Sequence, residues 1–311
     1  MAELTNFTVD NSQKTISELR CKAEFTEKAH SELIFLSVLN TFLSITAFLE
    51  NTLILVALHK DTSLHPPSKL LFRNLAITDL FVGISAEPLH VVYWMSEVKE
   101  RWNVCFYAQV SGISVSYILC AVSLSTMTAI SVDRLLALSL GLRYRQVVTF
   151  KRTCVTITGF WICSIVGSSL QFLNPVITAW YQYTGTALCL SITFFAYARI
   201  FFILRNNRIH VQTPQRQPNQ AIPVNIARYT KAVYSALWVQ VTLVVCYLPV
   251  AIVVALTSQR GIPISMYLAR QFTITVVFLN SSLNPLLYCW KIREVRQAVK
   301  ETLRGLRCSS N

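Results

Sequence analysis

The chain has 311 residues, of which 53% are apolar and only 14% are charged, and its formal net charge is +13. A soluble domain carries about 25% charged residues, so this deficit excludes an ordinary soluble globular protein and indicates a chain that lies in lipid. In a soluble chain the positive charge would suggest a nucleic-acid partner, but here we assign it to attraction by anionic lipid and expect no nucleic-acid partner.

Seven apolar stretches follow one another, each near or above the roughly 20 residues that cross a bilayer as a helix. They cover residues 33–58, 70–95, 104–138, 154–172, 177–204, 232–256 and 267–288. Lys and Arg gather in the connections on the side of the carboxyl end, which places the amino tail outside. The sequence therefore predicts an all-α bundle of seven transmembrane helices at 33–290, after an outer tail at 1–32 and before a cytoplasmic segment at 291–311.

The predicted outer side carries two kinds of residue that can be covalently modified. Asn6 begins an Asn-Phe-Thr triplet, which is a glycosylation acceptor only if the tail lies outside. Cys21 and Cys105 are the only cysteines on this oxidising side, so they form one disulfide or remain as two free thiols.

Asp79 lies near the middle of the second stretch. A carboxylate at that depth costs at least about 2.5 kcal/mol, so we expect it to face the bundle and to have polar partners. The polar residues at a similar depth are Ser123, Asn280, Ser281 and Asn284. Two interpretations stand: a hydrogen-bonded network that holds helices together, or a site for a small cation such as sodium.

The third stretch ends at Asp133-Arg134. A charge at the end of a transmembrane helix is either an anchor that reaches the interface or a functional contact. Beyond it, Leu142 is an isolated apolar residue among cations, which indicates either packing or a docking contact for a cytosolic partner.

Two prolines lie inside predicted spans. Pro249 follows Cys246-Tyr247-Leu248 in the sixth stretch, and Pro285 follows Asn284 near the cytoplasmic end of the last. Proline removes one backbone hydrogen bond, so we expect a hinge at Pro249 and a second break at Pro285.

Two cytoplasmic segments follow from composition. Residues 205–228 are rich in Gln and Pro, which predicts a flexible loop. Residues 291–303 alternate apolar and cationic positions at helical spacing, which predicts a short amphipathic helix on the inner leaflet. Cys308 lies just beyond and is either palmitoylated, as a second anchor, or a free thiol.

Taken together, these residues resemble the rhodopsin-like (class A) G-protein-coupled receptors. The matching positions run through nearly the whole bundle, in order: Asn51, Leu75-Ala76-x-x-Asp79, Trp102, Asp133-Arg134, Trp161, Tyr197, Cys246-x-x-Pro249 and Asn284-Pro285-x-x-Tyr288. The resemblance implies a receptor of the plasma membrane, not an enzyme, that transmits binding of an extracellular ligand to a heterotrimeric G protein.

The departures from the family pattern are specific. Gln109 stands where the family has a cysteine, so the resemblance makes a Cys21–Cys105 disulfide the substitute. A short second outer loop and Cys189 in place of a proline are similar to the melanocortin branch, which is related to the adenosine and cannabinoid receptors. Gln109 and Ile113 stand where melanocortin receptors place calcium-binding acids, so that ligand chemistry is not expected.

The resemblance also assigns a switch at the cytoplasmic end. The sixth helix swings outward about Pro249 and frees Arg134, which Asp133 helps to hold at rest, to meet the G-protein α-subunit. The residues of this switch are Asp133, Arg134, Leu142, Tyr197, Tyr247, Pro249, Asn284, Pro285 and Tyr288. No acid on the sixth helix is placed to pair with Arg134, so we expect signalling without agonist.

Two further sites follow from the resemblance. It favours the sodium interpretation for Asp79, Ser123, Asn280, Ser281 and Asn284; no other cofactor is expected. The ligand pocket is assigned to Glu87, His90, Ser116, Tyr117, Cys120, Tyr181, Tyr247, Val250 and Phe278. Because this wall is mostly apolar and aromatic, a small neutral or lipid-like ligand is favoured.

Two other functions remain as alternatives. A transporter needs an inverted repeat or paired broken helices around a midplane site, and no repeat is visible. A receptor-like scaffold that does not signal has no need of Arg134, Tyr197 and Tyr288, all of which are present.

Overall fold

The structure is a computed structural model that describes residues 21, 23–60, 64–212, 241–253, 256, 264–291, 296–297 and 299–300. Every regular element within those ranges is a helix: α2 (Ala23–Lys60), α3 (Pro66–Phe81), the π-helical turn η1 (Val82–Ala86), α4 (Glu87–Val98), α5 (Trp102–Leu140), η2 (Gly141–Arg143), α6 (Tyr144–Val147), α7 (Phe150–Ser169), η3 (Leu170–Phe172), α8 (Pro175–Gln212) and α10 (Ile264–Lys291). A further short apolar helix covers Val241–Val253.

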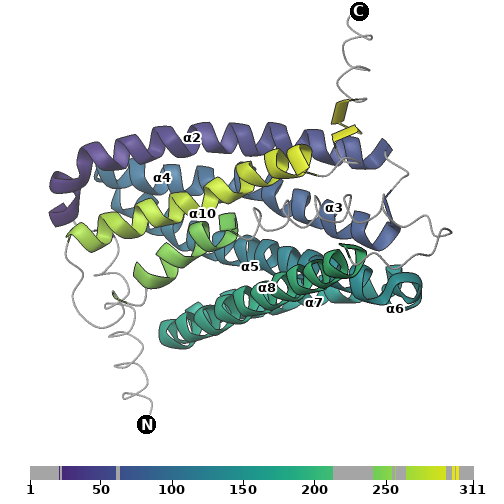
Figure 1. Ribbon diagram of the computed structural model, residues 1–311. Helices are drawn as coiled ribbons and strands as arrows, with labels where there is room; N and C mark the ends of the chain where they lie inside the picture. The colour runs from purple at the N-terminus through teal and green to yellow at the C-terminus, as the bar shows by residue number, and fades with distance from the viewer. Residues whose placement is uncertain are drawn as a thin grey trace, which may run out of the picture.

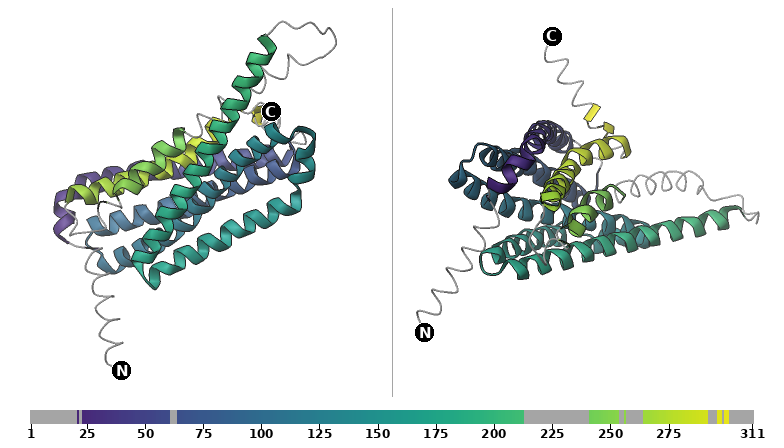
Figure 2. Two further views of the ribbon diagram at one scale, coloured as in Figure 1. Left: turned by 60° about the horizontal axis from the view of Figure 1, so that its bottom comes forward. Right: turned by 90° about the vertical axis from the view of Figure 1, so that its left-hand side faces the viewer.

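The long helices run lengthwise beside one another as one elongated bundle (Figure 1, Figure 2). Helix α5 is the central element, because it packs against α3, α4, α7 and α8. Helix α2 packs against α4 and α10. The run from α3 through η1 to α4 is continuous and counts as one span, Pro66–Val98.

Five helical segments are long and apolar enough to cross a membrane: Ala29–His59, Pro66–Val98, Trp102–Val147, Phe150–Phe172 and Ile177–Ile203. Helix α10, with 28 residues, also exceeds the span length, and Val241–Val253 is part of the predicted sixth stretch. Large apolar side chains are exposed on the outward faces, for example Phe35, Val38, Phe42, Phe194 and Phe195. Such faces belong in lipid, and the predicted all-α transmembrane bundle is confirmed.

Because α5 runs the length of the bundle, it defines two ends. We call the end that holds Cys21 and Cys105 the disulfide end, and the end that holds Asp133 and Arg134 the Arg134 end. One buried apolar cluster, which includes Ala29, Leu33 and Trp94, lies at the disulfide end. The larger cluster joins α2, α3, α5, α10 and Val241–Val253 through residues such as Ile54, Leu58, Phe72, Leu75, Met127, Leu243 and Val277.

Two helices extend farthest beyond the predicted stretches. Helix α2 begins at Ala23, inside the predicted tail at 1–32, because Ala29 and Leu33 are buried in the bundle and hold this extra length. Helix α8 continues to Gln212, so the first part of the loop predicted at 205–228 is helical. No Pro or Gly interrupts the chain between Arg205 and Gln212, so nothing stops the helix there.

The expected break at Pro285 does not occur, since α10 continues through this residue to Lys291. Proline at 285 leaves the carbonyl four residues earlier, that of Ser281, without its helical N–H partner. The side chain of Asn51 on α2 donates a hydrogen bond to that carbonyl, with Nδ2 3.1 Å from the oxygen. A buried amide therefore replaces the missing backbone donor, and the helix remains whole.

Helices α7 and α8 pack closely at Gly167, where the ring of Tyr181 occupies the space of a side chain. A Cβ added there would lie 2.1 Å from Cε1 of Tyr181, whose hydroxyl donates to the Cys163 carbonyl at 3.0 Å. We expect Gly167→Ala to displace this ring and to destabilise the protein by about 1–3 kcal/mol, the usual cost of overpacking. Thermal unfolding of the purified protein in detergent measures the effect.

Gly159→Ala on the same helix is the matched control, because a Cβ there has nothing within 4 Å. Its melting temperature should equal or exceed that of the unchanged protein, since alanine favours a helix. Equal melting temperatures for the two alanine variants would show that the Tyr181 ring does not fix the α7–α8 contact.

Candidate functional site

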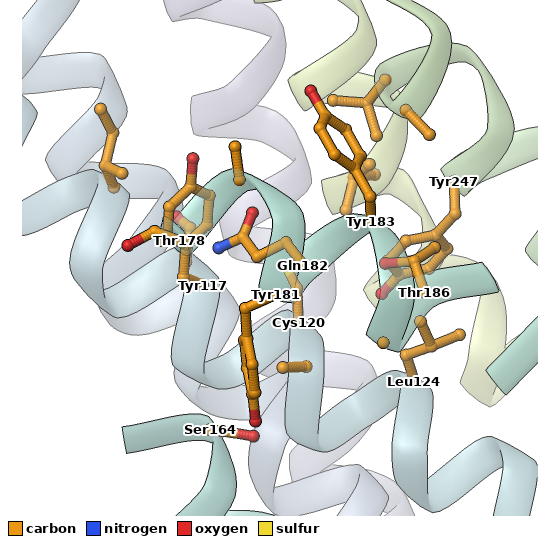
Figure 3. Close-up of a pocket in the computed structure, with 18 of the residues that line it drawn as sticks. Tyr117, Cys120, Leu124, Ser164, Thr178, Tyr181, Gln182, Tyr183, Thr186 and Tyr247 are labelled. Carbon is orange, nitrogen blue, oxygen red and sulfur yellow. The ribbon is translucent and has the colours of Figure 1, made fainter. Parts of the chain in front are cut away.

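A cavity of about 380 Å³ lies among α4, α5, α7, α8, α10 and the helix Val241–Val253 (Figure 3). This volume is within the range of small-molecule sites. All but one of the residues predicted to form a pocket line it: His90, Ser116, Tyr117, Cys120, Tyr181, Tyr247, Val250 and Phe278. The structure thus brings together, in one cavity, side chains from five separate helices.

Glu87 is the predicted pocket residue that does not line the cavity. Its carboxylate is fully buried, and neither oxygen has a hydrogen-bond partner among the described residues. The resemblance assigned Glu87 to the pocket together with His90, which lies three residues later on α4 and does line the cavity. The turn Val82–Ala86 just before Glu87 is π-helical, and the Glu87 side chain is buried between helices outside the cavity.

Several polar residues of the lining were not predicted from the sequence: Ser164, Gln171, Thr178, Gln182, Tyr183, Thr186 and Arg270. Figure 3 shows Tyr181 extending toward Ser164 of α7, while Tyr183 points the other way. Gln171 lies in η3, and its side-chain amide donates to the Ser114 hydroxyl. Arg270, a lone cation near the start of an apolar stretch, is the residue of this set that the sequence itself marks as unusual.

Asp79 is fully buried at the centre of the bundle. Its Oδ1 accepts hydrogen bonds from the hydroxyls of Ser123 on α5, at 3.2 Å, and Ser281 on α10, at 3.0 Å. Its Oδ2 accepts one from Nδ2 of Asn284 at 2.8 Å. Three helices, α3, α5 and α10, therefore meet at this carboxylate, as the sequence predicted.

Asn280 belongs to the predicted set but makes no hydrogen bond to Asp79 in the described structure. Its Nδ2 lies 3.9 Å from the sulfur of Met127, and its Oδ1 is buried without a partner. Ser281, the next residue of α10, does reach Asp79, so the difference lies in direction: adjacent residues of a helix point about 100° apart, and the Asn280 side chain is turned toward Met127.

The oxygen atoms around Asp79 suit a small hard cation. The carboxylate supplies charge, the serine hydroxyls supply neutral oxygens, and Oδ1 of Asn284 is buried without a partner. Among the described residues no three His, Cys, Asp or Glu side chains lie together as metal ligands. A single carboxylate among neutral oxygens fits a monovalent ion better than zinc, which prefers nitrogen and sulfur ligands.

At the Arg134 end, Asp133 is held by two hydroxyls. Tyr144 in α6 donates to Oδ1 at 2.6 Å, and Ser68 in α3 donates to Oδ2 at 2.9 Å. Arg134 lies over the ring of Phe72, with its guanidinium carbon 5.6 Å from the ring centroid. In the described structure, therefore, it is Tyr144 and Ser68, and not Arg134, that contact the Asp133 carboxylate.

The other predicted switch residues are placed as follows. Tyr197 is buried, and its hydroxyl accepts a hydrogen bond from Ser131 at 3.1 Å. Leu142 is 98% exposed. Tyr247 is buried and Pro249 is half-buried in Val241–Val253. The side chain of Tyr288 lies outside the described part of the structure.

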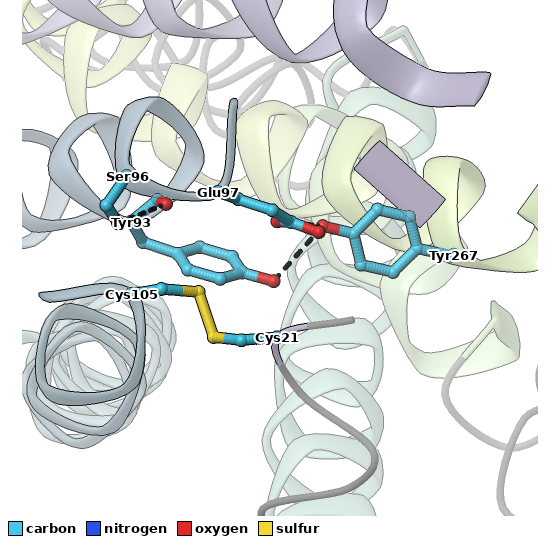
Figure 4. The surroundings of a disulfide bond; sticks show 6 residues. All are labelled: Cys21, Tyr93, Ser96, Glu97, Cys105 and Tyr267. Atoms are coloured by element: carbon cyan, nitrogen blue, oxygen red, sulfur yellow. Dashed lines mark hydrogen bonds between the residues drawn. A yellow bond between two sulfur atoms is a disulfide. The ribbon is translucent and has the colours of Figure 1, made fainter. Parts of the chain in front are cut away.

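The disulfide end is closed by a covalent bond and a polar cluster (Figure 4). Cys21 and Cys105 form a disulfide, which confirms the substitute pairing. Next to it, Tyr267 of α10 donates to the buried carboxylate of Glu97 on α4 at 2.6 Å, and the Tyr93 and Tyr267 hydroxyls are 3.1 Å apart. The disulfide thus ties the chain just before α2 to α5, and the hydroxyl and carboxylate contacts tie α4 to α10, all at one end of the bundle.

The two remaining predicted modifications, at Asn6 and Cys308, lie outside the described residues. The amphipathic segment predicted at 291–303 is described at only a few positions. Among these, Val299 is buried whereas Arg296 and Lys300 are exposed, as an amphipathic helix requires.

Comparison with known proteins gives the same family as the motifs. A family model described as 7 transmembrane receptor (rhodopsin family) matches residues 50–183, which contain Asp79 and Asp133-Arg134. Melanocortin receptor 5 of Homo sapiens is 27% identical over 283 residues, which cover 85% of this chain and 83% of that protein. Melanocortin receptor 5 of Pan troglodytes is 26% identical over 281 residues, with the same shares covered.

Proposed function

We propose, from the premise that this chain is a rhodopsin-like (class A) G-protein-coupled receptor related to the melanocortin branch, that it transmits binding of an extracellular ligand to a heterotrimeric G protein. The observation that carries the proposal is that three sites lie one after another along α5. This one helix borders the cavity at Cys120, meets Asp79 at Ser123 and carries Asp133-Arg134 about two turns before its end at Leu140. A ligand, a buried charge and a cytoplasmic cation thus act on a single rigid element.

The proposed orientation puts the disulfide end outside the plasma membrane. A disulfide persists in an oxidising compartment, which supports this placement of Cys21–Cys105. The Arg134 end then faces the cytoplasm, where Lys and Arg predominate in the connections. In this orientation a G protein meets Arg134 and the exposed Leu142 from the same side.

Signal transmission is proposed as a shift between two states of the bundle. The cavity contacts Tyr247 and Val250, which flank Pro249, so a ligand there acts directly on the hinge of the sixth span. The proline lacks one backbone hydrogen bond and lets the helix bend. Outward movement of this helix opens the cytoplasmic face around Arg134.

Sodium at Asp79 is proposed as a regulator of this equilibrium. The ion would be held by the carboxylate, the hydroxyls of Ser123 and Ser281, and Oδ1 of Asn284. It supplies positive charge that ties α3, α5 and α10 together, so it favours the compact resting state. Asn280, whose Oδ1 is buried and has no partner, is the nearest further oxygen of the predicted set.

The receptor proposal is tested by expressing the chain with a promiscuous G-protein reporter and screening ligands broadly. We expect a basal signal above that of mock-transfected cells, because no described acid pairs with Arg134. A transporter, the alternative by class, predicts substrate uptake in place of nucleotide exchange on the G protein. A signal equal to mock, with and without every ligand, would refute the receptor function.

The contact between Tyr144 and Asp133 gives a more specific expectation for the basal signal. Removing the Tyr144 hydroxyl leaves Oδ1 of Asp133 without its 2.6 Å donor, and Arg134 is the adjacent cation that can replace it. We therefore expect Tyr144→Phe to lower basal nucleotide exchange about 5-fold, as loss of one hydrogen bond to a charged group permits.

The matched control is Tyr107→Phe, which removes a hydroxyl from a side chain 72% exposed on α5 near the disulfide end. Its basal exchange should equal that of the unchanged protein. A Tyr144→Phe variant with unchanged or higher basal exchange would mean that Tyr144 does not keep Asp133 from Arg134.

A further inference from the structure

The cavity contains one charge. Arg270, at the beginning of α10, is the only Asp, Glu, Lys or Arg among the described lining residues. No acidic side chain of the described structure pairs with it. Arg270 is half-buried. A guanidinium that lines a cavity without a counter-ion is a site for an acidic group, because a carboxylate or phosphate can accept two parallel hydrogen bonds from it.

Polarity changes along the cavity. Its disulfide-end part holds Arg270, Thr178, Gln182 and Tyr183, which come early in α10 and α8. Further along the same helices the lining is mostly apolar, with Val277, Phe278 and Cys189, and with Cys120, Ala121 and Leu124 from α5; the short hydroxyl side chains of Ser125 and Thr186 are the polar members there. The cavity is therefore polar and cationic at one end and apolar at the other, which matches an amphiphile and not a compact polar solute.

The cavity also reaches the lipid-facing surface. Cys163 of α7 and Tyr181 and Gly185 of α8 line the cavity and are also exposed on the outside of the bundle. Tyr181 bridges to α7 at Cys163, but one turn further along α8 a Cβ at Gly185 would have nothing within 4 Å, so the border is open beyond Tyr181. Figure 2, left, shows α7 and α8 separating along their length from the end where η3 connects them.

We propose that the ligand of this cavity is a single-chain amphiphile with an acidic head group, which enters from the bilayer between α7 and α8. The head group, a carboxylate or a phosphate, binds Arg270, and the chain lies along Cys120 and Leu124 toward Tyr247. The proposal rests on the proposed function only in taking this cavity as the ligand site. It replaces the neutral ligand expected from the sequence, where Arg270 was not counted in the pocket.

The head group is tested by direct binding to the full chain, purified and placed in nanodiscs of zwitterionic lipid. The probes are dodecanoic acid, dodecyl phosphate and methyl dodecanoate, with concentrations expressed as mole fraction in the bilayer. At least one acid should bind at least about 10-fold more tightly than the ester, the usual effect of a hydrogen bond to a charged group. Whichever acid binds more tightly identifies the head group.

Arg270→Gln should remove that preference, whereas Arg270→Lys should retain a part of it. Arg101→Gln is the matched control, because Arg101 is an exposed cation at the same end of the bundle and does not line the cavity. Equal binding of acids and ester, no binding of either acid, or an acid preference that survives Arg270→Gln would each overturn the proposal.

The route of entry has its own test. Gly185→Trp should narrow the gap between α7 and α8 and slow association and dissociation of the acidic probe by a similar factor, at least about 5-fold. Leu188→Trp is the matched control, since Leu188 is exposed on the same helix but does not line the cavity. Probe kinetics equal in the two variants would overturn entry from the bilayer.

The same nanodiscs, supplied with a purified G-protein heterotrimer, separate this inference from the receptor function. Acid-selective binding that depends on Arg270 without nucleotide exchange sustains the inference and refutes the receptor. Ligand-independent nucleotide exchange without acid-selective binding sustains the receptor and refutes the inference.

Discussion

We expect Arg134→Ala to reduce basal and ligand-dependent G-protein activation to near the background level, while the amount of protein at the cell surface stays unchanged. In the described structure the guanidinium makes a cation–π contact with Phe72 and is not tied to Asp133. It is therefore available to a partner when the sixth span moves away. Truncating one side of a buried charged contact costs about 2–5 kcal/mol, which is enough to lower activation at least about 30-fold.

The measurement is nucleotide exchange on a purified heterotrimer, normalised to surface expression by antibody labelling. Arg143→Ala is the matched control, because Arg143 is an exposed cation in η2, near the same end of the bundle. Its exchange rate should remain within about 2-fold of the unchanged chain, as expected for an exposed charge. If Arg134→Ala signals normally, Arg134 has no part in the proposed coupling.

The positions of the spans and the partners of Asp79 could be predicted because they depend on simple periodicities. A bilayer fixes the length of an apolar helix, and a four-residue spacing fixes a helix face. Ser281 and Asn284 therefore meet Asp79 as expected. Asn280 contacts Met127 instead, although its neighbour Ser281 reaches Asp79, since spacing along one helix does not give that helix's rotation relative to another.

The position of Glu87 was not predicted correctly, although His90 on the same helix lines the cavity as expected. A resemblance gives a residue's place in the chain, but not the direction in which its side chain points. The contact between Tyr144 and Asp133 was also missed. Gly141, with φ of 51°, ends α5 and reverses the chain so that Tyr144 returns to Asp133. The glycine indicates a turn, but not which side chain the turn will bring back.

Pro285 shows how tertiary contacts override a local rule. Taken alone, a proline in a helix predicts a break, because one carbonyl loses its donor. Asn51 supplies a donor from another helix, 230 residues away in the chain. Replacing a backbone bond by a side-chain bond requires a packed bundle, so this outcome follows from the fold and not from the sequence near Pro285.

Asp79→Asn should remove the effect of sodium on basal signalling. In the unchanged chain, sodium chloride should reduce basal nucleotide exchange at least about 5-fold relative to choline chloride at equal ionic strength, the lower range of couplings between sites. The variant should give the same rate in both salts. Asparagine has the same shape and keeps an oxygen that can accept the hydrogen bonds from Ser123 and Ser281, so the fold should be retained. The negative charge that attracts the cation is lost.

Glu87→Gln is the control that makes this test specific. This variant neutralises a second carboxylate, which is as buried as that of Asp79 and lies on the same span. In the described structure neither oxygen of Glu87 has a hydrogen-bond partner. A cation site requires several oxygens converging on one charge, so the sodium effect should persist in Glu87→Gln. If the sodium effect disappears in both variants, the ion responds to the summed negative charge of the bundle interior. If the effect persists in Asp79→Asn, sodium acts elsewhere, and the Asp79 cluster only holds α3, α5 and α10 together.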